Sequence, residues 1–340
     1  MTYLLAESEP PASGLSRAMQ DQVDKLMDEC ERAKDNPGSF AHKARVRVKK
    51  IRAALRLARP MLGRKAYRKQ NRWWRNAARE LSDLRDAGAR LEAMDSLRPF
   101  LIARIGTAMT RKLTERFEKE QRAADARAPI KAFRRRLRKR GGKLLPRLPA
   151  GRRSDLAEQL AESYRASRRA MKAALATGEP AMLHEWRKQA KSHALQARLV
   201  RQTFPATLAE RHIAARDLAE LLGAVQDIEV VFEGIADWTE GPDGLAEALQ
   251  GRRGELVEEA RAAGEALFGA KTKAWVKLLA RRKERKAATP RSVRASKQDL
   301  ASSRRPRRRA SMPRSAPSTS ALASSLEQPV AAGAARLKWT

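Results

Sequence analysis

The chain has 340 residues and a formal net charge of +34, because 73 Lys and Arg stand against 39 Asp and Glu. A surface this cationic repels itself and attracts polyanions such as nucleic acid, anionic lipid or a phosphate polymer. A single cysteine excludes a disulfide scaffold and a cysteine-based metal site, and the lack of any run of about 18 apolar residues excludes a transmembrane helix. The N-terminus lacks the charged and apolar regions of a secretory signal, so we expect a cytoplasmic protein.

Nearly all of the chain up to about residue 285 has the composition of helices. Ala, Leu, Arg, Glu and Lys dominate, and runs of β-branched residues with a period of two are absent. Long helices joined by short loops rich in Gly and Pro predict an all-α protein of antiparallel helix bundles. The predicted helices cover residues 16–34, 40–62, 65–87, 99–126, 130–140, 154–176, 180–203, 206–237, 244–267 and 271–286.

Composition also predicts the domain organisation. A helical domain covers residues 15–285 after a lead of residues 1–14, and a basic linker with Gly and Pro at residues 141–153 divides it into two halves. Residues 286–340, rich in Ser, Pro, Ala and Arg, read as a disordered basic tail. The ordered part is cationic by itself, since residues 281–340 carry +13 and the rest of the chain carries +21.

The two halves contain similar sequence segments. AHKARVRVKKIRAALRLA, which contains His42, aligns with LHEWRKQAKSHALQARLV, which contains His184, at an offset of 142 residues. LSDLRDAGA, which contains Asp86, aligns with LGAVQDIEV, which contains Asp227, at an offset of 141 residues. Two landmarks at nearly one offset predict an internal duplication, with the halves at about residues 15–140 and 154–285.

Each aligned helix carries a row of cations. At about 100° per residue, one stripe about 80° wide and about 21 Å long adjoins the apolar stripe of its helix, which contains Ala44, Val48, Ile51 and Leu55. This first row consists of His42, Arg45, Lys49, Arg52 and Arg56. The second row consists of His184, Arg187, Lys191 and Arg198, with Ala194 at the position of Arg52.

A linear row of cations suits a linear row of phosphates, because Arg binds phosphate through two parallel hydrogen bonds and Lys adds a compact charge. Like charges at this spacing destabilise a helix by a few tenths of a kcal/mol per pair, and a ligand that neutralises them offsets that loss. A charged helix face is often merely solvated. Both rows begin with a histidine at the same register, however, and this favours a ligand.

These motifs resemble the CHAD (conserved histidine α-helical domain) family. The resemblance covers about residues 15–285 and rests on H-x-x-R-x-x-x-K from His42, H-x-W-R-K-x-x-K-x-H from His184, and the segments that end at Asp86 and Asp227. It implies two four-helix bundles with pseudo-twofold symmetry and a basic central cavity. It also implies binding of inorganic polyphosphate and localisation to polyphosphate granules.

The resemblance also implies site residues. Those that would line the cavity are His42, Arg45, Lys49, Arg52, His184, Arg187, Lys188 and Lys191. Arg56 and Arg198 extend the rows on geometry alone, and Arg85 is a further candidate whose alternative role is pairing with a carboxylate.

No catalytic or metal-binding motif accompanies the rows, so we expect no enzymatic activity and no cofactor. His184 and His193 lie about 180° apart on one helix and cannot chelate one ion from it. His193 falls on the buried side of its helix, where a structural role is favoured over ligand contact. The expected function is therefore non-enzymatic polyphosphate binding. The alternative is nucleic-acid binding by a basic helical protein whose tail acts as a non-specific arm.

Overall fold

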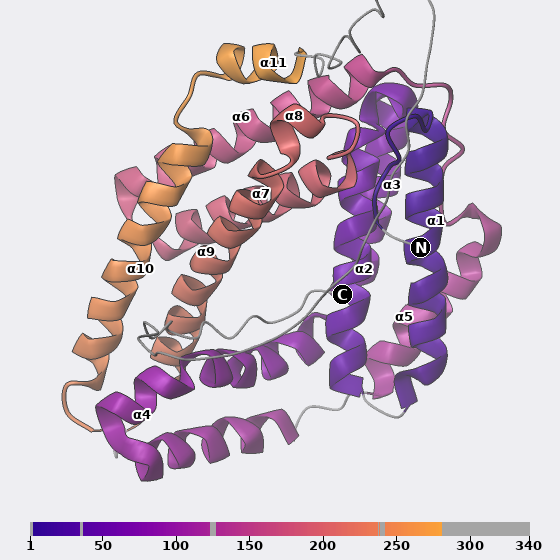
Figure 1. The fold of residues 1–340 in the computed structure, drawn as a ribbon. Helices are drawn as coiled ribbons and strands as arrows, with labels where there is room; N and C mark the ends of the chain where they lie inside the picture. Colours follow the sequence, from indigo (N-terminus) through magenta and orange to yellow (C-terminus); the bar gives the residue numbers. More distant parts are fainter. Residues whose placement is uncertain (1–2, 35–36, 123–126, 237, 239–241, 281–340) are drawn as a thin grey trace, which may run out of the picture. The chain divides into compact units, whose positions relative to one another are not determined.

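A computed structural model describes residues 3–34, 37–122, 127–236, 238 and 242–280. The fold is all-α, and the described residues contain no strand. Figure 1 shows the arrangement of the helices. Their bounds are α1 Pro11–Glu31, α2 Pro37–Leu57, α3 Arg59–Arg79, α4 Ser82–Arg122, α5 Arg127–Arg140, α6 Arg153–Thr177, α7 Pro180–Leu199, α8 Pro205–Leu208, α9 Arg211–Gly234, α10 Leu245–Phe268 and α11 Thr272–Ala280, with single 3₁₀ turns η1 at Arg32–Lys34 and η2 at Gly141–Lys143.

The first half departs from the predicted helix boundaries at one proline. A loop was expected over residues 88–98, before Pro99, but α4 runs through Pro99 without a break. The flanking Leu97 and Leu101 are 5% and 0% exposed, and their packing holds the helix together although proline removes one backbone hydrogen bond. The break lies instead at Gly106, whose φ of 74° is a conformation that only glycine adopts readily.

Other boundaries also differ. The helix predicted over residues 40–62 ends at Leu57, and α3 begins at Arg59. The helix predicted over residues 65–87 ends at Arg79, and a new helix begins at Ser82. The helix predicted over residues 206–237 is divided into the single-turn α8 and the longer α9. The break predicted between Leu62 and Lys65 is confirmed, because Gly63 within α3 has a φ of 71°.

Two contacts between helices of the first half have counterparts in the second. α1 packs against α2 and α2 contacts α4, while α6 packs against α7 and α7 packs against α9. The contacts between the halves include α2 with α7 and α4 with α9. The helices α2, α4, α9 and α7 therefore each contact the next and return to the first, which brings the two helices with cationic rows together (Figure 1).

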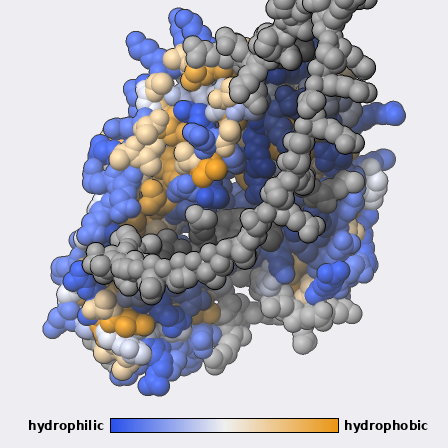
Figure 2. All heavy atoms as spheres, viewed as in Figure 1, coloured by the Kyte–Doolittle hydropathy of each residue, from blue (hydrophilic) through white to orange (hydrophobic). Residues whose placement is uncertain are grey.

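The apolar stripe predicted on α2 is confirmed as part of the core. Ala44, Val48, Ile51 and Leu55 are all 1% exposed or less. In the second half, Trp186 on α7 and Trp275 on α11 are also completely buried. Figure 2 shows hydrophilic side chains over most of the coloured surface, with hydrophobic side chains gathered on the upper left over helices of the second half. The residues predicted to form the basic tail, 286–340, lie outside the described residues.

Packing of α10 against α7 depends on a small residue. A Cβ added at Gly264 would lie 2.4 Å from Trp186 Cζ2 and 3.0 Å from Met171 Sδ. We therefore expect Gly264→Ala to lower the free energy of unfolding by about 1–3 kcal/mol, because the buried indole cannot move away without strain.

Gly251→Ala is the matched control in the same helix, since a Cβ there meets nothing within 4 Å. It should raise the free energy of unfolding by about 0.5–1 kcal/mol. Urea unfolding followed by circular dichroism measures both changes. Equal stability of the two variants would contradict this account of the α7–α10 contact.

Candidate functional site

The first row lies along α2 and points toward α3 and the start of α4. Arg45 donates through Nη1 to Ala78 O and to Ser82 Oγ, both at 3.4 Å. Arg52 donates through Nε to Asn71 Oδ1 at 2.9 Å. Arg45 and Arg52 are therefore held by neighbouring helices of their own half.

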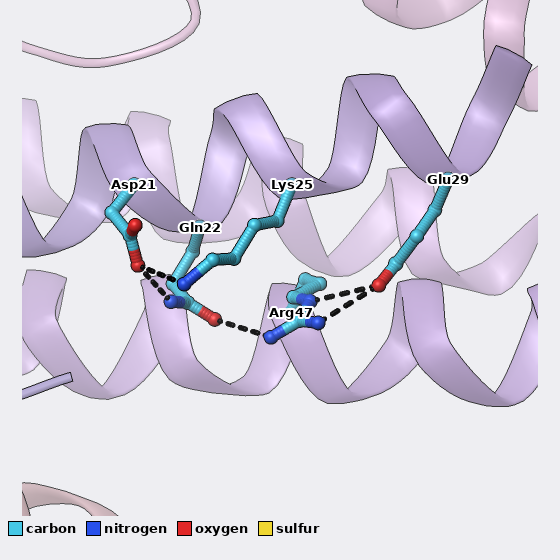
Figure 3. A network of polar contacts seen from close by, with 5 residues as sticks. All are labelled: Asp21, Gln22, Lys25, Glu29 and Arg47. Atoms are coloured by element: carbon cyan, nitrogen blue, oxygen red, sulfur yellow. Dashed lines mark hydrogen bonds and ion pairs between the residues drawn. The ribbon is translucent and has the colours of Figure 1, made fainter. Parts of the chain in front are cut away.

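On the face of α2 that contacts α1, the arginine has a carboxylate partner. Arg47 donates to Glu29 Oε1 on α1 at 2.9 and 3.1 Å and to Gln22 Oε1 at 3.3 Å, and Lys25 pairs with Asp21 beside it (Figure 3). A carboxylate thus neutralises the guanidinium at the α1–α2 contact. The acceptor of Arg52 is a neutral amide, which orients the guanidinium without cancelling its charge.

Burial sets the electrostatics of Arg52. Burial and the positive charge of the adjacent Arg56 together lower the pKa of the guanidinium to about 10, with burial the larger cause. Arg52 nevertheless remains protonated at neutral pH. It is a half-buried cation next to another cation, which favours the approach of an anion.

His42 and Lys188 each lie beside a carboxylate. His42 Nδ1 lies 3.3 Å from Glu92 Oε1, and both side chains are about half exposed, at 50% and 56%. Lys188 forms an ion pair with Glu185 on its own helix and is 55% exposed. Lys49, by contrast, is half-buried within the first row.

The second row faces α9. Arg187 donates through Nη1 to Gln226 Oε1, and His184 also hydrogen-bonds to this amide. Burial lowers the pKa of His184, and the charges of Lys188 and Arg187 lower it further against the opposing effect of Gln226. His184 is therefore neutral at pH 7 and gains its proton only at lower pH.

A glycine on α9 makes room for this arginine. A Cβ added at Gly223 would lie 2.8 Å from Arg187 Nη2. Gly223 and Gln226 both belong to the L-G-x-x-x-D segment that ends at Asp227. The sequence motif was noted for its Asp, and the structure shows that its Gly and Gln position the second row.

The two rows approach each other where α2 contacts α7. Arg56 at the end of the first row donates through Nη1 to Ser192 Oγ on α7 at 2.9 Å. Tyr3, which is buried, donates through its hydroxyl to Lys50 O at 2.8 Å. Burial raises the pKa of Tyr3, and the positive charges of Arg198 and Arg56 oppose this rise, so the last arginines of both rows lie close to one hydroxyl.

Sequence reasoning missed Lys50, which lies beside this junction. Lys50 is 5% exposed, and burial, together with the charges of Arg47 and Arg198, lowers the pKa of its amine to about 8. On a helical projection Lys50 falls outside the stripe of the first row, so the periodicity of the sequence did not predict it as a site residue. The structure places this nearly buried cation between the α1–α2 contact and Arg198 of the second row.

The remaining expected site residues are Lys191, Arg198 and Arg85. Lys191 and Arg198 are half-buried on α7. The side chain of Arg85 lies outside the residues whose side chains the structure describes. Within the described ranges, no three His, Cys, Asp or Glu residues gather into a group that could hold a metal ion, and no helix has the length and apolar character needed to cross a membrane.

The structure assigns His193 to the core. It is 0% exposed and has Tyr164, Phe268 and Trp275 around it. His193 Nδ1 lies 2.7 Å from Ser163 Oγ, and this hydroxyl donates its proton to Leu160 O at 2.9 Å. His193 is therefore the donor through Nδ1, and its ring is neutral.

Comparison with known proteins identifies the family. A scan against protein-family models matches the CHAD domain over residues 17–236. The chain belongs to the CHAD domain family. Both histidines that begin the rows lie within the CHAD match, as do all the helices from α2 to α9. Searches of the curated proteins and of the solved structures returned no significant match.

The burial of His193 predicts a pH-dependent stability. Burial and, to a lesser degree, the charge of Arg211 lower the pKa of His193 to about 3, whereas an unfolded histidine titrates near pH 6.5. Between these two values the unfolded chain binds a proton that the folded chain excludes, so stability falls as the pH falls below about 6.5. The slope should approach about 1.4 kcal/mol per pH unit.

His193→Gln removes this titration and should flatten the pH dependence of the free energy of unfolding by that amount between pH 6 and 5. Urea unfolding at pH 7.5, 6 and 5 measures the difference between the two proteins. Parallel curves for the wild type and the variant would show that His193 is not excluded from protonation in the folded state.

Proposed function

We propose that this CHAD protein binds inorganic polyphosphate along the cationic rows of α2 and α7, without catalysing a reaction. The family is associated with polyphosphate binding. The observation that carries the proposal is the contact between the two helices that bear the rows, joined by the hydrogen bond from Arg56 to Ser192. Two rows on touching helices offer one ligand a continuous track of positive charge.

The architecture proposed with this function is a duplicated pair of four-helix bundles around a shared basic cavity. Support comes from the parallel order of contacts, since α1–α2 and α2–α4 in the first half correspond to α6–α7 and α7–α9 in the second. The closed circuit of contacts through α2, α4, α9 and α7 would form the walls of such a cavity. Arg45 and Arg52 of the first row bond to α3 and α4, and Arg187 of the second row bonds to α9. Arg56 bonds to α7 and so links the two rows.

Electrostatics favours a ligand with high charge density. Burial lowers the pKa of both Arg52 and Arg198, and neighbouring arginines lower it further, which shows that solvent does not fully stabilise these charges. A phosphate chain replaces the missing solvation with charge-assisted hydrogen bonds, which are roughly twice as strong as neutral ones. The charges of a phosphate chain are evenly spaced, and the chain carries no bases. A narrow track of cationic side chains is therefore enough to bind it.

The first test compares two ligands on the full chain. Long-chain polyphosphate and duplex DNA are titrated at equal phosphate concentration in about 150 mM salt. We expect polyphosphate to bind more tightly. Equal affinities would reduce the interaction to general charge attraction and overturn the proposal.

The same test includes a pair of variants. Arg56→Gln/Arg198→Gln should weaken polyphosphate binding about 10- to 100-fold, because two charge-assisted contacts are lost where the rows meet. The matched control is Arg169→Gln/Lys172→Gln, which removes two exposed charges from α6 and should change the affinity less than twofold. Isothermal titration calorimetry of the three proteins gives the comparison, and equal losses in the two variants would argue against the rows.

The histidines predict a pH dependence of binding. A protonated imidazole attracts phosphate and a neutral one does not, so the affinity of the wild type should fall from pH 6 to pH 8. Because the pKa of His184 is lowered, most of its contribution should appear at the acid end of this range.

The variant His42→Gln/His184→Gln should show a flatter profile over the same range. The slope of log affinity against pH, measured for both proteins in one buffer series, is the readout. Identical slopes would remove the histidines from the binding site.

A further inference from the structure

A second cationic surface lies away from the rows, on the outer side of α3 next to α5. A groove of about 680 Å³ is lined there mainly by Arg64, Lys65, Arg68, Lys69, Arg72 and Trp73. An adjoining groove of about 610 Å³ shares Lys69 and Trp73 with it and adds Arg135, Lys139 and Lys143. Together they form what we call the α3–α5 groove, and none of its residues belongs to either row.

The five cations that α3 contributes to the α3–α5 groove are exposed and uncompensated. In the part of the chain that the structure describes, the side chains of Arg64, Arg68 and Arg72 make no hydrogen bond or ion pair, and the same is true of Lys65 and Lys69. The carboxylate that lines the groove, Glu80, is already paired with Arg136 at 2.5 Å. Positive charges four residues apart destabilise α3, so a bound polyanion would stabilise it.

An aromatic ring stands at the centre of this surface. Trp73 is half-buried and lines both parts of the groove. The neighbouring Trp74, which is 0% exposed, holds its ring in an edge contact at 4.9 Å. The guanidinium of Arg140 lies over the Trp73 ring at 4.4 Å and is fixed by hydrogen bonds to Gln70 Oε1 at 2.8 Å and to the carbonyl oxygen of Lys143 at 2.7 Å.

We propose that the α3–α5 groove binds single-stranded nucleic acid, with phosphates on the lysines and arginines and a base stacked on the Arg140 guanidinium that lies over Trp73. Unpaired bases stack on aromatic rings and on guanidinium planes. The guanidinium covers one face of the indole at 4.4 Å, and Trp73 therefore holds it in place as a platform for a base. Inorganic polyphosphate has no ring to stack on this platform. In a duplex the bases are stacked on each other, so a single strand is the form of nucleic acid that this site fits. The proposal does not depend on the rows of α2 and α7.

The test uses the full chain and two probes, a fluorescein-labelled 20-nucleotide oligo(U) and inorganic polyphosphate. Trp73→Ala should weaken oligo(U) binding about tenfold, because one stacked base is lost, and change polyphosphate binding less than twofold. Trp73→Tyr keeps an aromatic ring and should recover most of the oligo(U) affinity. If Trp73→Ala weakens both probes equally, or neither, the base-stacking site is refuted.

Charge variants test the groove without altering the partly buried indole. Lys69→Gln/Arg72→Gln removes two exposed cations three residues apart, and Arg169→Gln/Lys172→Gln removes the same two charges at the same spacing on α6. Lys69→Gln/Arg72→Gln should weaken oligo(U) binding at least fivefold. It should also reduce the slope of log affinity against log salt by about 1.4, because two phosphate contacts are lost. Arg169→Gln/Lys172→Gln should change neither the affinity nor the slope. Equal losses in the two pairs would refute a defined groove.

Oligo(U) binding by Arg56→Gln/Arg198→Gln separates this proposal from the one for the rows. We expect that variant to keep its affinity for oligo(U) within twofold. A loss as large as that of Lys69→Gln/Arg72→Gln would place the nucleic acid on the rows and overturn the assignment to the α3–α5 groove.

Discussion

Two helices that each carry a row of cations pack against each other, and the rest of the described structure holds them together against their repulsion. Arg56 of α2 is bonded to Ser192 of α7, and Arg198 lies close enough to influence both Tyr3 and Lys50. The apolar burial along α2 and α7 outweighs this local repulsion. Positive charge is concentrated at the contact between the halves, so an anion that binds there stabilises the folded protein. Ligand binding and stability are therefore coupled.

The position of the first row follows from the core packing of α2. The row adjoins the stripe that contains Val48, Ile51 and Leu55, so burying the stripe draws the neighbouring arginines partly into the protein. Neutral oxygen atoms of Asn71 and Ser192 then orient two of them. The neutral partners of Arg52 and Arg56 differ from those at the α1–α2 contact, where carboxylates complete the ion pairs of Arg47 and Lys25.

Periodicity predicted the parts of this structure that depend on one helix at a time. The buried stripe of α2 and the core position of His193 follow from a helical projection, and both are confirmed. The path of the chain at Pro99 could not be predicted, because tertiary packing of Leu97 and Leu101 outweighs a local preference. Partners between helices were also inaccessible: no pattern in the sequence joins Arg187 to Gln226 or places Lys50 near Arg198.

The two cationic surfaces differ in what surrounds their charges, and this difference separates their ligands. Arginines of the rows are partly desolvated and bonded to neutral groups, an environment in which a dense, base-free phosphate chain gains most. The five cations that α3 contributes to the α3–α5 groove are exposed, lack partners among the described residues and lie beside an indole. In this environment charge alone discriminates little between polyanions, and the aromatic ring provides the selectivity. A protein with a large uniform charge can thus distinguish polyanions through the few neutral atoms next to its cations.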